Sequence, residues 1–195
     1  KAKGPPVLSN MELYKAPNFL TEPLIKRNRE GEVTLISSDK HLEMYYTLNG
    51  TEPDTGSNRY SGPFSLSKPG TLKAVSVNPE NGEISVVSSR YLDIPKKNWK
   101  VIRPESADAG ETVLMMDENP NTYWSSPENS MLKPGIVIDL GQTYSLEGFT
   151  YLPNQERYPF GIITNYECYV SSDNRNWKLV SKGEFANIVN SRLEQ

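Results

Sequence analysis

The densest collection of potential ligand atoms in this sequence is the stretch from Asp117 to Glu128. Oxygen-bearing side chains stand at positions 1, 3, 5, 9 and 12 of the stretch, which is the ligand spacing of an EF-hand calcium loop. Position 6 is Thr122 rather than the glycine that such a loop needs, and no amphipathic helix flanks the stretch, so an EF-hand is excluded. Two interpretations remain: a hard-cation site of another kind, or a polar turn whose side chains bond their own backbone.

Few other residues could carry chemistry. The one histidine, His41, stands among charged neighbours and reads as an exposed loop residue, which excludes a His-rich zinc site. The one cysteine, Cys168, excludes an internal disulfide framework and reads as a small core residue. No nucleophile elbow, phosphate loop or dinucleotide fingerprint occurs. A pair of carboxylates could still approach each other, but the acids lie mostly in loops and turns, so we expect this chain not to be an enzyme.

The charge balance argues against two classes of partner. The 195 residues include 21 Lys and Arg against 24 Asp and Glu, a formal net charge of -3. Without a basic excess the chain is not expected to bind nucleic acid or an anionic membrane surface. No apolar run approaches the ~20 residues that cross a bilayer, so we expect no membrane insertion.

Apolar residues alternate in short runs bounded by Gly, Pro, Asn, Asp and Ser, a pattern typical of all-β sandwiches. In the first half, Asn49-Gly50 predicts a type I′ turn after the second of the expected strands. In the run Asn165–Ser171, Tyr166, Cys168 and Val170 share one face. The expected strands are Val33–Ser37, Glu43–Leu48, Thr71–Asn78, Ile84–Leu92, Trp99–Ile102, Gly135–Gly141, Leu146–Pro153, Asn165–Ser171 and Asn176–Ser181.

Two segments lack this alternation. Residues 1–16 are proline-containing and read as an extended leader. Residues 94–98, with Pro95, Lys96 and Lys97, interrupt the strand pattern and predict a linker. The sequence therefore predicts two β-sandwich domains, covering residues 17–93 and 99–195.

A hairpin pattern ending in Gly-Pro-Phe marks the first half. Its residues read YYTLNGTEPDTGSNRYSGPFSL from Tyr45 to Leu66, followed by TLKAVSVN at Thr71–Asn78. They resemble the chitobiase/β-hexosaminidase C-terminal type domain. The resemblance covers about residues 17–93 and implies an immunoglobulin-like sandwich.

A second series of motifs marks the other half, in the order DENPNTYWSS, IVIDLG, GFTYLPNQ, NYECYVSSDNRNW and GEFANI, between Asp117 and Ile188. The series resembles a discoidin domain, the coagulation factor five/eight type C fold, and within it the family 32 carbohydrate-binding modules. The resemblance covers about residues 97–195 and implies a jelly-roll sandwich with ligand loops at one end. Family members continue with a further core strand and a late acidic residue, so we expect residues 99–195 to be incomplete at the C-terminus.

The resemblance also implies a structural Ca²⁺ in the Asp117–Thr122 turn. By resemblance, the Asp117 carboxylate, the Asn119 carbonyl, and the Thr122 hydroxyl and carbonyl are ligands, and the Leu114 carbonyl closes the ring. Hard oxygens of these kinds suit Ca²⁺. Glu118 departs from the family pattern, which favours glycine at this position.

A sugar offers an apolar ring face and in-plane hydroxyls, so its site needs an aromatic side chain and planar polar groups. Galactose-binding members of the family often carry His and Arg where this chain has Ser125 and Asn154, so galactose specificity does not carry over. Tyr158 and Phe160 could instead pack onto the sandwich. The expected carbohydrate-binding residues are Ser125, Asn154, Gln155, Arg157, Tyr158 and Phe160.

The resemblances imply the non-catalytic accessory region of a secreted bacterial glycoside hydrolase of the hexosaminidase/chitobiase or α-L-fucosidase type. Its expected partners are a glycan or polysaccharide and the catalytic domain of the parent enzyme, and its expected location is extracytoplasmic. A structural spacer that binds no sugar is the alternative, favoured by Ser125 and Asn154. A discoidin-type adhesion module is a third interpretation. Lipid-binding relatives expose apolar residues on long loops, and this sequence shows no such cluster beyond Tyr158-Pro-Phe160.

Overall fold

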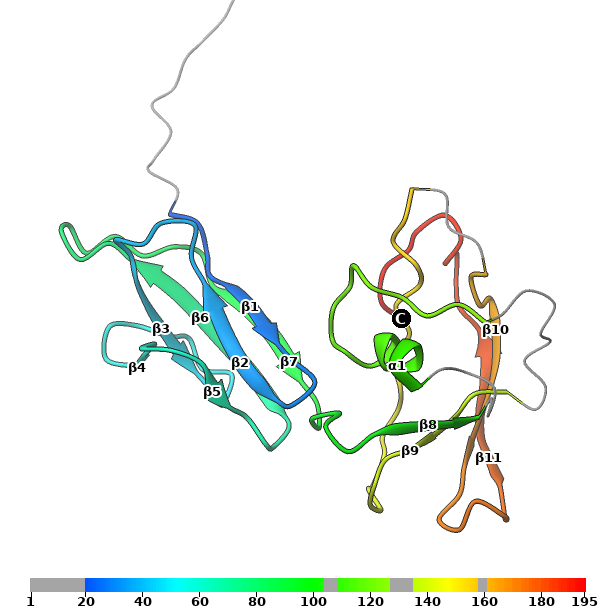
Figure 1. The fold of residues 1–195 in the computed structure, drawn as a ribbon. Helices are drawn as coiled ribbons and strands as arrows, with labels where there is room; N and C mark the ends of the chain where they lie inside the picture. The colour runs from blue at the N-terminus through cyan, green and yellow to red at the C-terminus, as the bar shows by residue number, and fades with distance from the viewer. Residues whose placement is uncertain (1–19, 104–108, 127–134, 158–160) are drawn as a thin grey trace, which may run out of the picture. The chain divides into compact units, whose positions relative to one another are not determined.

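The computed structural model describes residues 20–103, 109–126, 135–157 and 161–195. Nearly all of the regular secondary structure in the described residues is β-strand, which confirms the predicted fold class (Figure 1). The chain divides into two compact units. Of the described residues, the first unit contains 20–25, 35–62 and 70–92, and the second contains 26–34, 63–69 and those from 93 to 195.

Two sheets form in the first half of the chain, with strand orders β1-β2-β5 and β4-β3-β6-β7. Alternate residues are buried along β1 and β2, while β6 is the most deeply buried strand because Ala74 to Val77 are all enclosed. Branched and aliphatic side chains therefore line the inner faces of a sandwich. The strands are β1 (Leu24–Arg27), β2 (Glu32–Ile36), β3 (Glu43–Thr47), β4 (Asn58–Arg59), β5 (Phe64–Ser65), β6 (Gly70–Val77) and β7 (Ser88–Leu92).

The turn at Asn49-Gly50 is not the expected type I′ turn. Gly50 has φ 76°, but Asn49 is not among the described residues with positive φ. The Asn49 side chain instead accepts hydrogen bonds from the Thr51 backbone N–H (3.2 Å) and hydroxyl (2.7 Å). An Asx turn therefore stands where the mirror-image turn was expected, and the chain continues through a longer loop to β4, which pairs with β3.

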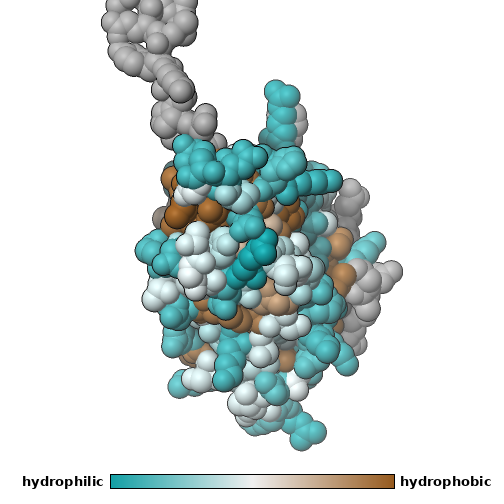
Figure 2. All heavy atoms as spheres, turned by 90° about the vertical axis from the view of Figure 1, so that its left-hand side faces the viewer, coloured by the Kyte–Doolittle hydropathy of each residue, from teal (hydrophilic) through white to brown (hydrophobic). Residues whose placement is uncertain are grey.

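Hydrophobic side chains also reach the surface, in patches separated by polar residues (Figure 2). The predicted strand Ile84–Leu92 is shortened to β7, and Ile84 makes only an isolated bridge to Val77. The exposed large side chains in the first half include Leu24, Ile36, Ile84, Val86, Val87 and Tyr91.

Among its described residues, the second half contains two antiparallel strand pairs, β8-β9 and β10-β11. In β10, Tyr166, Cys168 and Val170 are the half-buried residues, as the alternation predicted, and a bulge follows Cys168. Burial raises the pKa of the Cys168 thiol. The elements are β8 (Lys100–Arg103), α1 (Ala109–Thr112), a 3-10 turn (Val113–Met115), β9 (Val137–Asp139), β10 (Asn165–Val170) and β11 (Lys178–Glu184).

Aromatic contacts take the place of the strand expected at Leu146–Pro153, which has no strand in the structure. Tyr166 packs against Phe185 with ring centroids 4.7 Å apart and against Phe149 at 5.1 Å. Tyr151 also contacts Phe185, and its backbone exchanges hydrogen bonds of 2.8 and 3.2 Å with Gln195. Among the described residues no helix has the length and apolar composition required to cross a bilayer.

Candidate functional site

The Asp117–Thr122 turn brings several oxygen atoms together. It follows the 3-10 turn Val113–Met115, which contains Leu114. The Thr122 Oγ1 lies 2.7 Å from the Asp117 Oδ2 and 2.9 Å from the Asn119 carbonyl oxygen. The other Asp117 oxygen accepts a hydrogen bond from the Asn119 N–H at 3.0 Å. Three hard oxygens therefore converge in a turn that is also satisfied by its own hydrogen bonds.

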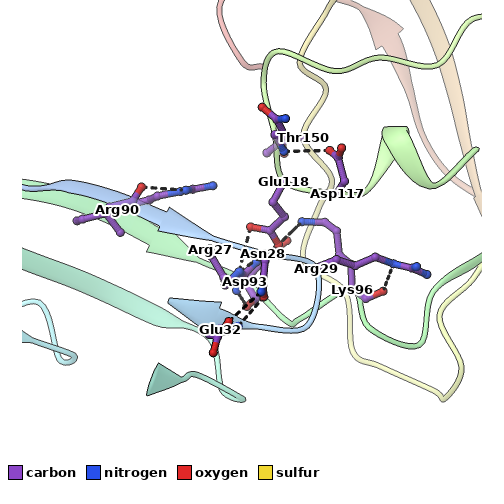
Figure 3. A network of polar contacts seen from close by, with 12 residues as sticks. Arg27, Asn28, Arg29, Glu32, Arg90, Asp93, Lys96, Asp117, Glu118 and Thr150 are labelled. Atoms are coloured by element: carbon purple, nitrogen blue, oxygen red, sulfur yellow. Dashed lines mark hydrogen bonds and ion pairs between the residues drawn. The ribbon is translucent and has the colours of Figure 1, made fainter. Parts of the chain in front are cut away.

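Glu118 occupies the left-handed region in this turn, with φ 63°. Its carboxylate oxygens both accept hydrogen bonds of 3.0 Å from the Arg27 Nε, and the Lys96 ammonium lies 3.0 Å from one of them. Arg27 also donates to the Asp93 carbonyl and pairs with its carboxylate. Figure 3 shows these four residues converging, and we call Arg27, Asp93, Lys96 and Glu118 the Arg27 cluster. All four belong to the second unit.

The central pair of the Arg27 cluster is deeply buried. The side chains of Arg27 and Glu118 are 1% and 3% exposed. Burial disfavours the charged guanidinium, but the hydrogen bonds to Glu118 and Asp93 outweigh it and raise the pKa of Arg27. Removing one partner of such a pair costs about 3–5 kcal/mol because the other charge is left buried alone.

The segment that follows Asp93 is held by contacts with the residues between β1 and β2. Arg29 donates hydrogen bonds to the carbonyl oxygens of Lys96 and Trp99. The Lys96 ammonium lies 5.6 Å from the centre of the Trp99 ring. Gly31 has φ 87°, and a Cβ there would meet the Pro95 ring at 2.8 Å, so only glycine fits this approach.

The loop from Pro153 to Arg157 is fixed by polar contacts. The Asn154 Oδ1 accepts from the Glu156 N–H at 2.8 Å, and the Gln155 Nε2 donates to the carbonyls of Pro153 (2.6 Å) and Arg192 (3.1 Å). The Arg192 guanidinium donates to the carbonyls of Asn154 and Glu156. The backbone of the loop is therefore anchored to the Arg192 segment.

Tyr123 joins this loop from a distant part of the sequence. Its hydroxyl donates a 3.1 Å hydrogen bond to the Glu156 carboxylate, which raises the pKa of Tyr123. The residue is 37% exposed, so part of its ring remains accessible to a ligand. An accessible aromatic ring thus lies next to a rigid loop of amide and carboxylate groups.

Comparison with known families identifies the domain that contains this loop and this turn. Residues 27–89 match the model of the chitobiase/beta-hexosaminidase C-terminal domain, and residues 102–194 match that of the F5/8 type C domain. The chain carries these two domains in tandem. The F5/8 type C domain contains both the oxygen-rich turn and the Tyr123–Glu156 contact.

Curated relatives include two proteins named galactose oxidase. One from Gibberella zeae is 30% identical over 114 residues, which are 54% of this chain and 17% of that protein. Another, from Gibberella zeae strain PH-1, is 32% identical over 88 residues, which are 43% of this chain and 13% of that protein. The aligned part of the chain spans less than a fifth of the length of either relative.

The structure brings some of the expected F5/8 type C site residues together. Asn154 and Gln155 lie in the loop that Tyr123 and Arg192 hold, while Ser125 and Arg157 are exposed. Tyr158 and Phe160 lie outside the described residues. Tyr123, which contacts this loop, is not among the residues expected from the sequence, although its place two positions before Ser125 in the Thr-Tyr-Trp motif was the available signal.

A further expectation concerns a metal ion in the F5/8 type C domain. The described residues contain no group of three or more His, Cys, Asp or Glu that could hold a metal ion. The ligand set expected for Ca²⁺ has one carboxylate and otherwise carbonyl and hydroxyl oxygens, so this finding does not test it.

Proposed function

We propose that the chain is a non-catalytic, carbohydrate-binding accessory region whose sugar site lies at Tyr123 and the Pro153–Arg157 loop. The observation that carries the proposal is the accessible Tyr123 ring, which Glu156 fixes beside the polar side chains of the loop. A pyranose ring stacks its apolar face on an aromatic side chain and directs its hydroxyls to planar amides and carboxylates. Both matched domain families are accessory types, which supports this function.

The parent protein in this proposal is a secreted bacterial glycoside hydrolase of the hexosaminidase/chitobiase or α-L-fucosidase type. The catalytic domain would supply the chemistry, and the tandem would hold the enzyme on its substrate. A single shallow site makes few contacts, so we expect dissociation constants near millimolar, or ~4 kcal/mol. Useful affinity would then come from several contacts with a polymeric glycan.

A glycan array followed by calorimetry tests sugar binding. Tyr123→Ala should abolish binding to any glycan that gives a signal, whereas Tyr123→Phe should keep most of it because the ring remains. Tyr91→Ala is the matched control, since Tyr91 is a 66% exposed tyrosine on β7 outside the F5/8 type C domain. Full binding by Tyr123→Ala would place the site elsewhere.

A structural spacer that binds no sugar is the second candidate. It is favoured by the internal hydrogen bonds that already engage the side chains of Asn154 and Gln155. A folded chain that binds no glycan on the array would support the spacer. Binding to lipid vesicles or to a protein receptor would instead support an adhesion module.

We also propose a structural Ca²⁺ in the Asp117–Thr122 turn. The residues fit this ion, because neighbouring oxygens 2.7–2.9 Å apart suit the crowded shell of 6–8 ligands at about 2.3–2.6 Å. Asp117, Asn119 and Thr122 would hold the ion, with the Leu114 carbonyl completing the set. Bound Ca²⁺ would stabilise the turn by neutralising the Asp117 carboxylate.

A further inference from the structure

We propose that Arg27 is a positioning residue for the Asp117–Thr122 turn. By binding the Glu118 carboxylate, it fixes the left-handed backbone of the turn and pre-organises the oxygens of Asp117, Asn119 and Thr122 for a hard cation. The cation part of this inference rests on the proposed Ca²⁺ site, whereas the effect on the turn does not.

The backbone of Glu118 needs such support. A non-glycine residue at φ 63° is strained because its Cβ crowds the backbone, so an isolated turn would favour another conformation. The Glu118 carboxylate reaches Arg27 and Lys96 from this conformation, and its side chain is 3% exposed. The ion pair between Arg27 and Glu118 thus stabilises the strained conformation.

Glu118 also lies directly between the groups that would bind the cation. Asp117 precedes it, and the Asn119 N–H and carbonyl follow it. A change in the backbone angles of Glu118 would rotate the Asp117 carboxylate away from the Asn119 carbonyl. The Thr122 hydroxyl, which contacts both groups, would then lose one of its partners.

The test is a double variant, Arg27→Met with Glu118→Gln, which removes both buried charges together. Replacing both members of a buried pair is tolerated far better than removing one. The matched control is Arg59→Met with Glu43→Gln, an exposed pair with a 2.6 Å contact in the first unit. Circular dichroism verifies the folding of both variants.

The first readout is amide hydrogen exchange at Asn119, Asn121 and Thr122 in the presence of EDTA. We expect exchange about tenfold faster in the Arg27→Met/Glu118→Gln variant, equivalent to about 1.4 kcal/mol, and no change in the control. Unchanged exchange in the folded variant would overturn the proposal. If the double variant fails to fold, Arg27→Lys replaces it, because lysine keeps the charge but lacks the planar guanidinium fork. Unchanged exchange in Arg27→Lys would then overturn the proposal.

The second readout is the affinity for Ca²⁺ by calorimetry. We expect binding about tenfold weaker in the double variant than in the wild type, with the control unchanged. Equal affinity would overturn the link between Arg27 and the cation. If the wild type does not bind Ca²⁺, the proposed metal site fails, and the exchange rates in EDTA still decide whether Arg27 holds the turn.

Discussion

Tyr123 and Glu156 are joined by a 3.1 Å hydrogen bond between hydroxyl and carboxylate, across 33 positions of sequence. The contact links the Thr-Tyr-Trp motif to the loop that follows Leu152-Pro153, the two segments on which the proposed sugar site depends. It brings an exposed aromatic ring and an acidic group into one small area. The contact can be tested without knowing the ligand.

Glu156→Gln should lower the pKa of Tyr123 toward its ordinary value. In the wild type the carboxylate accepts a hydrogen bond from the neutral phenol and repels the phenolate, and both effects raise the pKa of Tyr123. Titration of the tyrosines labelled with ¹³C at the ring carbon next to the hydroxyl measures the change. Tyr169, whose hydroxyl bonds Glu167, serves as an internal reference and should keep its raised pKa in the variant. An unchanged Tyr123 titration would contradict the contact.

Arg192→Ala should loosen the Pro153–Arg157 loop. Its guanidinium bonds the carbonyls of Asn154 and Glu156, and hydrogen bonds to charged groups contribute about 1.5–3 kcal/mol each. We expect a loss of about 1–2 kcal/mol in urea unfolding, because the half-exposed loop regains water, and weaker binding of any glycan found. Arg175→Ala, in an exposed turn, is the control. Equal stability of the two variants would show that Arg192 does not hold the loop.

Calcium should raise the melting temperature if the Asp117–Thr122 turn binds it. An ion at 100 times its dissociation constant adds ~2.7 kcal/mol to stability, which in a domain this small amounts to about 10 °C. Thermal melts in Ca²⁺ and in EDTA measure this difference, and Asp117→Ala should abolish it. Identical melting of the wild type in both conditions would remove the ion from the proposal.

Acid should weaken the β10–β11 hairpin through Asp173. The Asp173 carboxylate accepts hydrogen bonds from the backbone N–H groups of Asn176 and Arg175, and also from the Asn176 side chain and the Ser171 hydroxyl. These hydrogen bonds hold the pKa of Asp173 well below its usual range. A depressed folded pKa gives stability above the unfolded pKa of about 3.9 and loses it as pH falls toward the folded value. The urea midpoint of Asp173→Asn should therefore change less below about pH 4 than that of the wild type. Parallel curves for the two proteins would refute this, and Glu80→Gln gives the background.

Trypsin should cut after Lys97 before it cuts after Lys96. The Lys96 side chain pairs with Glu118 and lies over Trp99, while its carbonyl accepts a hydrogen bond from Arg29, whereas Lys97 is exposed. Mass spectrometry of early digests identifies the first cut within residues 94–98. Preferred cleavage after Lys96 would show that its contacts do not persist in solution.

The alternation of apolar residues predicted strands correctly where the segment also pairs with a neighbouring strand. The run Glu43–Leu48 became β3, and Asn165–Ser171 became β10 with the expected face half-buried. At Leu146–Pro153 the same pattern failed: Phe149 and Tyr151 contact the Phe185 ring, and Tyr151 exchanges backbone hydrogen bonds with Gln195, but the segment forms no strand. The periodicity of apolar residues predicts which side chains face inward, but it does not predict which strands pair by hydrogen bonds.

The contacts that shape the candidate sites were not predictable for a related reason. Arg27 and Glu118 are 91 positions apart, and nothing in the local sequence around either residue predicts its contact with the other. Glu118 was visible only as a departure from the glycine of its family. The structure gives a physical account of the departure, since the left-handed residue carries a side chain that an arginine binds.

The Arg27 cluster also bears on how this tandem could be inherited. Arg27 lies within the match to the first domain family, and Glu118 lies within the match to the second. A recombination event that separated the two matches would leave a buried acid without its arginine, and selection would then favour glycine at 118. Among descendants of such a chain, we expect arginine at 27 and glutamate at 118 to be gained and lost together, so the heritable block is longer than either domain.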